Sequence, residues 1–185
     1  IPGDIVDVNP YKKRKGYIEA EPIKWVTKST KRVNPKCDHF GVCGGCKWQN
    51  MKYEEQLVYK EKSVINDLKQ IGKVEIQKKL PILGAIDSYF YRNKMEYTFS
   101  GVPWYIGDES YDDVVIGLHV PKRFDKILNI NKCHINHDVF NDILQISKEV
   151  SVKEKMVPYD VRKHTGFLRF LVIRIGVHTN EVMVN

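Results

Sequence analysis

The sequence predicts an α+β fold with a partial β-barrel at its start, then a cysteine-rich loop, then an antiparallel sheet with flanking helices. Three observations predict this arrangement. Short apolar stretches broken by proline and basic turns fill the first 27 residues. Three cysteines then lie within a ten-residue span, 37–46. Segments in which apolar and polar residues alternate occupy much of the remainder. The 185 residues are 42% hydrophobic and 29% charged, which is typical of a globular chain of one or two compact domains.

Hydrophobic periodicity places the elements in order. Short strands are expected at residues 5–8, 16–21 and 23–27, as a small barrel requires. Apolar residues at helical spacing predict an amphipathic helix over 53–71, with Gly72 where a helix stop belongs. A second helix is expected over 139–150. The strands of the predicted sheet are 89–99, 114–120, 127–130, 167–178 and 182–184.

Charge is uneven along the chain, whose formal net charge is +7. Residues 1–36 hold nine Lys and Arg against four Asp and Glu, which accounts for +5 of the +7. A basic segment interleaved with aromatic residues suits a phosphate-rich partner such as RNA, although it is also compatible with a merely solvated surface. The candidate RNA contacts in this segment are Lys12, Lys13, Arg14 and Lys15.

Two further charged sites lie in the second half of the chain. The alternation over 89–99 places Arg92 and Lys94 on one strand face, where they can meet RNA phosphates or form the solvated side of the sheet. Residues 107–113 are acidic and are expected to be a solvated hairpin tip, because nothing fixes the spacing of their carboxylates.

The four cysteines carry the strongest signal. Cys37, Cys43, Cys46 and Cys133 are spaced C-x5-C-x2-C followed by a long gap. Two glycines between Cys43 and Cys46 permit a tight turn that aims two thiolates at one point. No secretory leader is visible, so a metal site is favoured over two disulfides.

The type of metal site stays open between two candidates. Structural zinc sites are usually built from two C-x2-C turns, and only one is present here. Three clustered thiolates and one distant thiolate favour a [4Fe-4S] cluster, whose ligands need not be paired in that way. His39 and His134 lie next to ligand cysteines and can replace one of them in a zinc site or simply line it.

The segment KCDHFGVCGGCKWQ at 36–49 resembles the cluster motif of the iron-sulfur RNA uracil-C5 methyltransferases. The pattern C-x5-C-G-G-C-x2-Q within it is specific. Weaker similarities follow in the same order, namely Y-R-N-K at 91–94, C-H-I at 133–135 and T-N-E-V at 179–182. The resemblance extends over essentially the whole chain.

This resemblance implies three functional segments. Residues 1–34 are expected to be the later part of a TRAM domain, an OB-like RNA-binding barrel, and residues 35–72 the cluster-binding loop and helix. Residues 73–185 are expected to be the central α+β RNA-recognition domain. The four cysteines would hold the [4Fe-4S] cluster in a structural role, and the cluster can be lost in aerobic handling.

In that family, S-adenosylmethionine and a cysteine nucleophile act in a further, Rossmann-like domain. Neither a glycine-rich cofactor loop nor a fifth cysteine occurs here, so we expect no catalytic residue in this chain and an excised, inactive fragment. The whole protein is expected to be a monomeric, cytoplasmic RNA methyltransferase without a membrane span, acting on 23S rRNA or, alternatively, tRNA. Two rival functions are a non-enzymatic zinc-binding RNA module and an electron-transfer protein.

Overall fold

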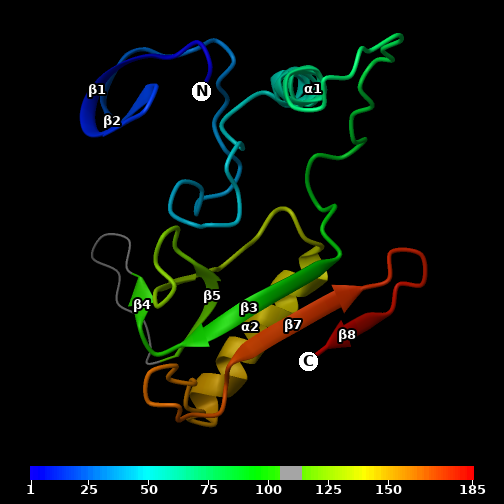
Figure 1. The fold of residues 1–185 in the computed structure, drawn as a ribbon. Helices are drawn as coiled ribbons and strands as arrows, with labels where there is room; N and C mark the ends of the chain where they lie inside the picture. Colours follow the sequence, from blue (N-terminus) through cyan, green and yellow to red (C-terminus); the bar gives the residue numbers. More distant parts are fainter. Residues whose placement is uncertain (105–113) are drawn as a thin grey trace. The chain divides into compact units, whose positions relative to one another are not determined.

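The computed structural model describes residues 1–104 and 114–185, and the predicted acidic loop at 107–113 lies outside them. The described chain forms two compact units (Figure 1). Unit 1 comprises Ile1–Pro35 and Trp48–Gly84, and unit 2 comprises Lys36–Lys47 and Ala85–Asn185. These units divide the chain differently from the three predicted segments, whose functions stay a prediction. No helix in the described ranges is long and apolar enough to cross a membrane.

Unit 1 begins with a long antiparallel hairpin, formed by β1 (Ile5–Arg14) and β2 (Tyr17–Thr27). The prediction of three short strands is wrong here, because residues 16–21 and 23–27 belong to one strand and the first strand extends past Pro10. Each strand of a two-stranded ribbon has an outer edge without a partner strand. Backbone N–H groups are not needed on that edge, so Pro10 and Pro22, which lack one, are tolerated. The turn between the strands contains Gly16, at φ +91°.

The helix of unit 1, α1 (Tyr53–Gln70), confirms the predicted helix almost residue for residue. Its carboxyl end is closed by the amides of Ile71 and Gly72, which both donate to the carbonyl of Asp67. Near its start, Glu55 pairs with Lys31 at 2.7 Å. None of the residues in α1 is buried, so its apolar positions are not part of a core within the described chain.

Unit 2 contains a six-stranded sheet in the order β4-β6-β5-β3-β7-β8. The predicted antiparallel sheet is confirmed for four of its five neighbouring pairs, whereas β4 and β6 are parallel. The segment predicted as 167–178 forms β7, which lies between two other strands, as expected for a central strand. The strands are β3 (Lys94–Ser100), β4 (Pro103–Trp104), β5 (Val115–His119), β6 (Ile127–Asn129), β7 (Phe170–Ile175) and β8 (Val182–Val184).

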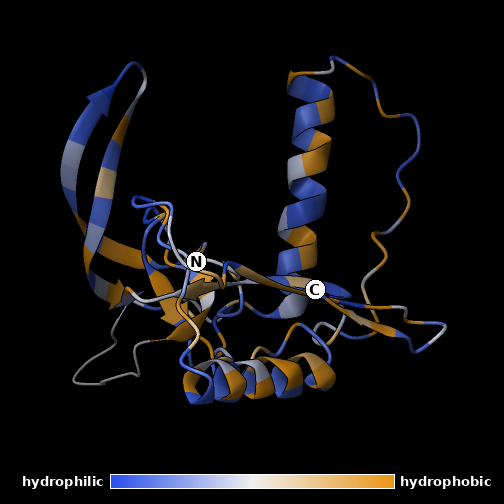
Figure 2. Ribbon diagram, turned by 90° about the horizontal axis from the view of Figure 1, so that it is seen from below, coloured by the Kyte–Doolittle hydropathy of each residue, from blue (hydrophilic) through white to orange (hydrophobic). Residues whose placement is uncertain are grey.

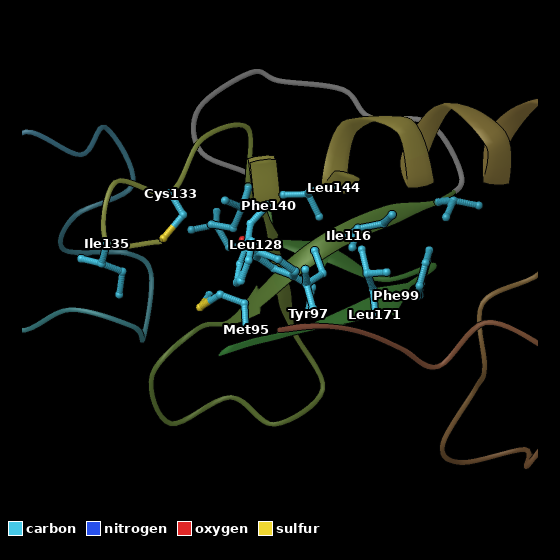
Figure 3. Close-up of a cluster of buried hydrophobic side chains, with 13 residues drawn as sticks. Met95, Tyr97, Phe99, Ile116, Leu128, Cys133, Ile135, Phe140, Leu144 and Leu171 are labelled. Atoms are coloured by element: carbon cyan, nitrogen blue, oxygen red, sulfur yellow. The ribbon is translucent and has the colours of Figure 1, made fainter. Parts of the chain in front are cut away.

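The second predicted helix is α2 (Asp138–Lys153), which covers one face of this sheet (Figure 2). Tyr97 and Phe140 belong to the core between helix and sheet, as the close-up shows (Figure 3), and both are fully buried, as is Ile173. Burial alternates along β3 as predicted, and its polar residues Lys94 and Glu96 are exposed on the other face. The α+β class is therefore confirmed, with α2 packed on the sheet and α1 belonging to the other unit.

A candidate cysteine site

All four cysteines belong to unit 2, although three of them lie in the short loop 36–47 and the fourth is far along the chain. The loop is a series of tight turns. The amide of Phe40 donates to the carbonyl of Cys37, and the amides of Val42 and Cys43 donate to that of His39. Gly41 adopts φ +93°, a left-handed conformation that glycine takes without strain. These turns bring three thiols into a short length of loop.

The loop is attached to the sheet of unit 2 through the turn between Cys43 and Cys46. The amide of Gly44 donates to the carbonyl of His119, at the end of β5, over 3.1 Å. A Cβ at position 44 would lie 2.7 Å from that carbonyl oxygen, so only glycine permits this approach. Cys43 and Cys46 also pack against the hydrophobic core. Gly44 therefore has a docking role in addition to the turn that the sequence predicted.

Cys133 is held from the other side by α2. It follows β6 at the margin of the core and is 8% exposed (Figure 3). Its amide donates to Oδ1 of Asn141 at 2.9 Å, and Nδ2 of Asn141 donates to the Cys133 carbonyl at 3.2 Å. Asn141 is itself buried, so this pair of hydrogen bonds satisfies backbone groups that cannot reach water. The clamp fixes the fourth cysteine on a rigid element.

None of the four cysteines forms a disulfide in the described structure, and their thiols lie close enough to interact electrostatically. Burial raises the pKa of Cys37, Cys43 and Cys133, and the thiolate of Cys46 raises the pKa of each of these three further. Backbone amides donate to the same three sulfur atoms and oppose this increase; the Gly45 amide, for example, lies 3.3 Å from Sγ of Cys43. The arrangement is therefore four buried or partly buried cysteines, and the sulfur atoms of Cys37, Cys43 and Cys133 accept hydrogen bonds from backbone amides.

Across residues 1–104 and 114–185, no group of three or more His, Cys, Asp or Glu side chains is placed to hold one metal ion. A tetrahedral zinc with Zn–S bonds of about 2.3 Å needs its sulfur atoms only about 3.8 Å apart. The thiols are thus neighbours without forming a closed site for one ion.

The two histidines next to the cysteines have different environments. Nε2 of His39 accepts a hydrogen bond from the amide of Asn131 at 3.2 Å, although the two residues are 92 positions apart. Nδ1 of His134 is buried and has no hydrogen-bond partner in the described structure. Burial, together with Lys36 and Lys132, lowers the pKa of His134 and favours its neutral form. Hence His39 helps to hold the loop, and His134 lines it.

The structure places Arg92 and Lys94 in unit 2, where both are exposed. Nε of Arg92 donates to the Lys94 carbonyl at 3.1 Å, and Nζ of Lys94 lies 3.4 Å from Oε2 of Glu96. Arg92 forms no ion pair with any described residue, so its charge is available to a ligand. It lines a cavity of about 610 Å³ together with Gly44 and Gly45 of the cysteine turn.

The other predicted RNA contacts belong to unit 1. Lys12, Lys13, Arg14 and Lys15 lie at the tip of the β1–β2 hairpin, and all four are exposed. Arg14 is paired with Glu19 at 2.9 Å, across the hairpin. The tip therefore presents a compact group of positive charge on a two-stranded ribbon.

Sequence reasoning missed two contributors to the site. Asn141 is an amide in the buried stripe of α2, beside Phe140, and this break in an apolar pattern was the available signal. Lys36, which precedes the first cysteine, lies over the rings of Tyr89 and Phe90, each at 5.0 Å. That contact joins the start of the loop to the segment before β3, and no local pattern predicts it.

Replacing Asn141 by Ala should destabilise unit 2 by about 1–3 kcal/mol, because the Cys133 amide and carbonyl lose their partners while buried. Urea denaturation followed by circular dichroism measures the loss. Gln145→Ala, on an exposed position of the same helix, is the matched control and should change stability by less than about 0.5 kcal/mol. Equal effects of the two substitutions would contradict the clamp.

Comparisons with known proteins find several relatives named as RNA methyltransferases, although no family model matches the chain. An uncharacterized RNA methyltransferase of Bacteroides thetaiotaomicron is 42% identical over 190 residues, which cover all of this chain and 42% of that protein. An uncharacterized RNA methyltransferase of Chlorobaculum tepidum is 35% identical and is matched over 40% of its length, again by the whole chain.

A solved structure is similar as well. The Pyrococcus abyssi tRNA (uracil-54, C5)-methyltransferase, in complex with S-adenosyl-L-homocysteine, matches all of this chain with a TM-score of 0.64 and 28% identity, over 39% of its own length. The chain thus spans about two fifths of each relative. It is related, along its whole length, to part of several proteins named as RNA methyltransferases.

Proposed function

We propose that this chain is the RNA-binding and [4Fe-4S]-binding part of an S-adenosylmethionine-dependent RNA uracil-C5 methyltransferase. One observation carries the proposal: Cys37, Cys43, Cys46 and Cys133 gather in one unit of a chain whose relatives are named RNA methyltransferases. The similar solved structure is a tRNA uracil-C5 methyltransferase bound to S-adenosyl-L-homocysteine, which supports the same reaction and cofactor.

The chemistry of the four sulfur donors fits a [4Fe-4S] cluster. Each thiolate of such a cluster binds a different iron, so the sulfur atoms need to surround a volume and not one ion. The thiols here are neighbours, and amides of Gly45, His39 and Ile135 donate to the sulfur atoms of Cys43, Cys37 and Cys133. Hydrogen bonds of this type stabilise the negative charge of ligated sulfur.

In this proposal the cluster has a structural role. Four cysteine ligands leave no iron open, and methyl transfer from S-adenosylmethionine requires no electron. A bound cluster supplies cross-links between loop 36–47 and the segment after β6. The residues of the chain do the rest: Gly44 docks the loop on β5, and Asn141 orients Cys133.

The RNA-binding role rests on charge. The hairpin tip carries four exposed cations, Arg92 is free of ion pairs with described residues, and Lys94 is exposed at the start of β3. Lys and Arg at such positions bind phosphates and release counterions. We propose that these groups hold the RNA while a further domain of the monomeric, cytoplasmic enzyme binds S-adenosylmethionine and methylates uracil.

The function is tested by incubating the full-length protein, purified without oxygen, with tritiated S-adenosylmethionine and RNA. We expect one methyl group per RNA at C5 of a uridine, identified by nuclease digestion and mass spectrometry. The expected substrate is 23S rRNA, and tRNA is the second arm because the similar structure acts on tRNA. Methylation of another base, or none on either RNA, would contradict the proposed reaction.

Metal analysis and redox measurements can instead favour one of two rival functions, a zinc-binding RNA module or an electron-transfer protein. One zinc per chain and no visible colour, together with RNA binding but no methylation, would identify a zinc-binding RNA module. Reversible reduction of a cluster, combined with indifference to RNA, would identify an electron-transfer protein. Neither rival is supported by the named relatives.

Replacing Lys12 and Lys13 by Ala should weaken RNA binding and make it less dependent on salt. The slope of log K against log salt should fall in magnitude by about 0.7 for each lost contact to single-stranded RNA, and by about 0.9 for duplex. Fluorescence anisotropy between low and moderate salt measures the slope. The control replaces Lys73 and Lys78, two exposed lysines outside the hairpin, and should leave it unchanged. Equal slopes in both variants would exclude the hairpin from the RNA site.

A further inference from the structure

We propose that the loop from Val120 to Lys126 binds one unpaired nucleotide of the RNA, with Phe124 stacking on the base and Lys122 and Arg123 contacting phosphates. The inference rests on the proposed RNA-binding function and assigns it a specific surface. This loop joins β5 to β6 in unit 2 and lies outside the cysteine motif and the basic hairpin.

Phe124 occupies an unusual position. Its side chain is 75% exposed, and it lines two cavities of unit 2, one of about 610 Å³ and one of about 1160 Å³. A single exposed apolar residue needs no explanation by itself, but an aromatic ring at the edge of two cavities offers a face on which a base can stack. The smaller cavity is of a size typical for small-molecule sites.

The charges around the loop favour an anionic ligand. Lys122, Arg123 and Lys126 form no ion pair with any described residue, whereas Asp125 is already paired with Arg162 at 3.1 Å. The acid of the smaller cavity, Glu96, lies beside Lys94. The free cations that line the smaller cavity are Arg92, Lys122 and Arg123. Their charge is complementary to the phosphates on either side of a stacked base.

The loop is held in shape before any ligand binds. The amide of Val120 donates to the Lys126 carbonyl at 3.2 Å, and the Arg123 amide donates to the Val120 carbonyl at 3.1 Å. Lys122 adopts φ 64°, which fixes the turn. His119, the residue before the loop, accepts the hydrogen bond from Gly44 of the cysteine turn. A preformed loop loses little conformational entropy when it binds.

The chemistry indicates a single-stranded segment and not a duplex. A ring can stack on a base only when that base is out of its own stack, as in loops, bulges and splayed ends. A protein partner would need a wider apolar surface than one ring flanked by cations. The site therefore fits an unpaired nucleotide, held next to the cysteine turn.

The test uses the full-length protein, purified without oxygen, and a uridine-containing RNA in two forms, single-stranded and fully paired. Phe124→Ala should weaken binding of the single strand about 5-fold to 150-fold, the range for one lost base–aromatic stack, and should have little effect on the duplex. Phe124→Trp should restore binding. Replacing Lys122 and Arg123 by Ala should reduce the salt slope by about 1.4 in magnitude.

Phe167→Ala is the matched control, since Phe167 is 76% exposed in the same unit and lines neither cavity. Ultraviolet cross-linking of a 4-thiouridine RNA, followed by mass spectrometry, should label the segment 120–126, a result that a purely structural role would not give. Full binding by Phe124→Ala with weakened binding by the hairpin variant would overturn this inference alone. Failure of the wild-type protein to bind any RNA would overturn the proposed function itself. If Phe124→Ala leaves RNA affinity unchanged but abolishes self-association of the protein, Phe124 contacts a second copy of this chain and not RNA.

Discussion

The docking of the cysteine loop on the sheet of unit 2 is the constraint on which the site depends. A loop of twelve residues, 36–47, has no core of its own, yet it is fixed at three places by the Gly44 amide, the His39 ring and the Lys36 ammonium group. Each contact reaches a different part of unit 2. Because these contacts join residues that are far apart in sequence, the fold of unit 2 is what brings Cys133 to the three cysteines of the loop.

The two faces of the same sheet differ: one packs against α2, and the other is polar and exposed. On one face Tyr97 is buried in a core that includes Phe140 of α2, and burial together with the nearby Cys133 raises the pKa of Tyr97. The other face presents polar and charged groups, among them Lys94 and Glu96. The core therefore lies directly beside the cysteines, and the polar face of the sheet is left for the RNA-binding role proposed above.

Local pattern predicted the parts of this structure that depend on nearby residues. The helix over 53–71, the alternation along β3 and the strand at 182–184 all follow from the spacing of apolar residues. The predictions were wrong where the pairing of strands decides the structure. A break was expected at Pro22, but the hairpin tolerates this proline because each of its strands has a free edge. A fully antiparallel sheet was expected, but β4 pairs in parallel with β6. The cysteine spacing indicated a metal site, but the clamp from Asn141 is a contact between distant segments that no pattern records.

The central claim is that the four cysteines form one [4Fe-4S] site, and metal analysis tests it most directly. Iron, acid-labile sulfide and zinc are measured with a visible spectrum on protein purified without oxygen, beside Cys133→Ser. The account predicts about four irons and four sulfides per chain, with a brown colour that the variant loses. One zinc per chain without colour, or iron that is unchanged in the variant, would contradict it.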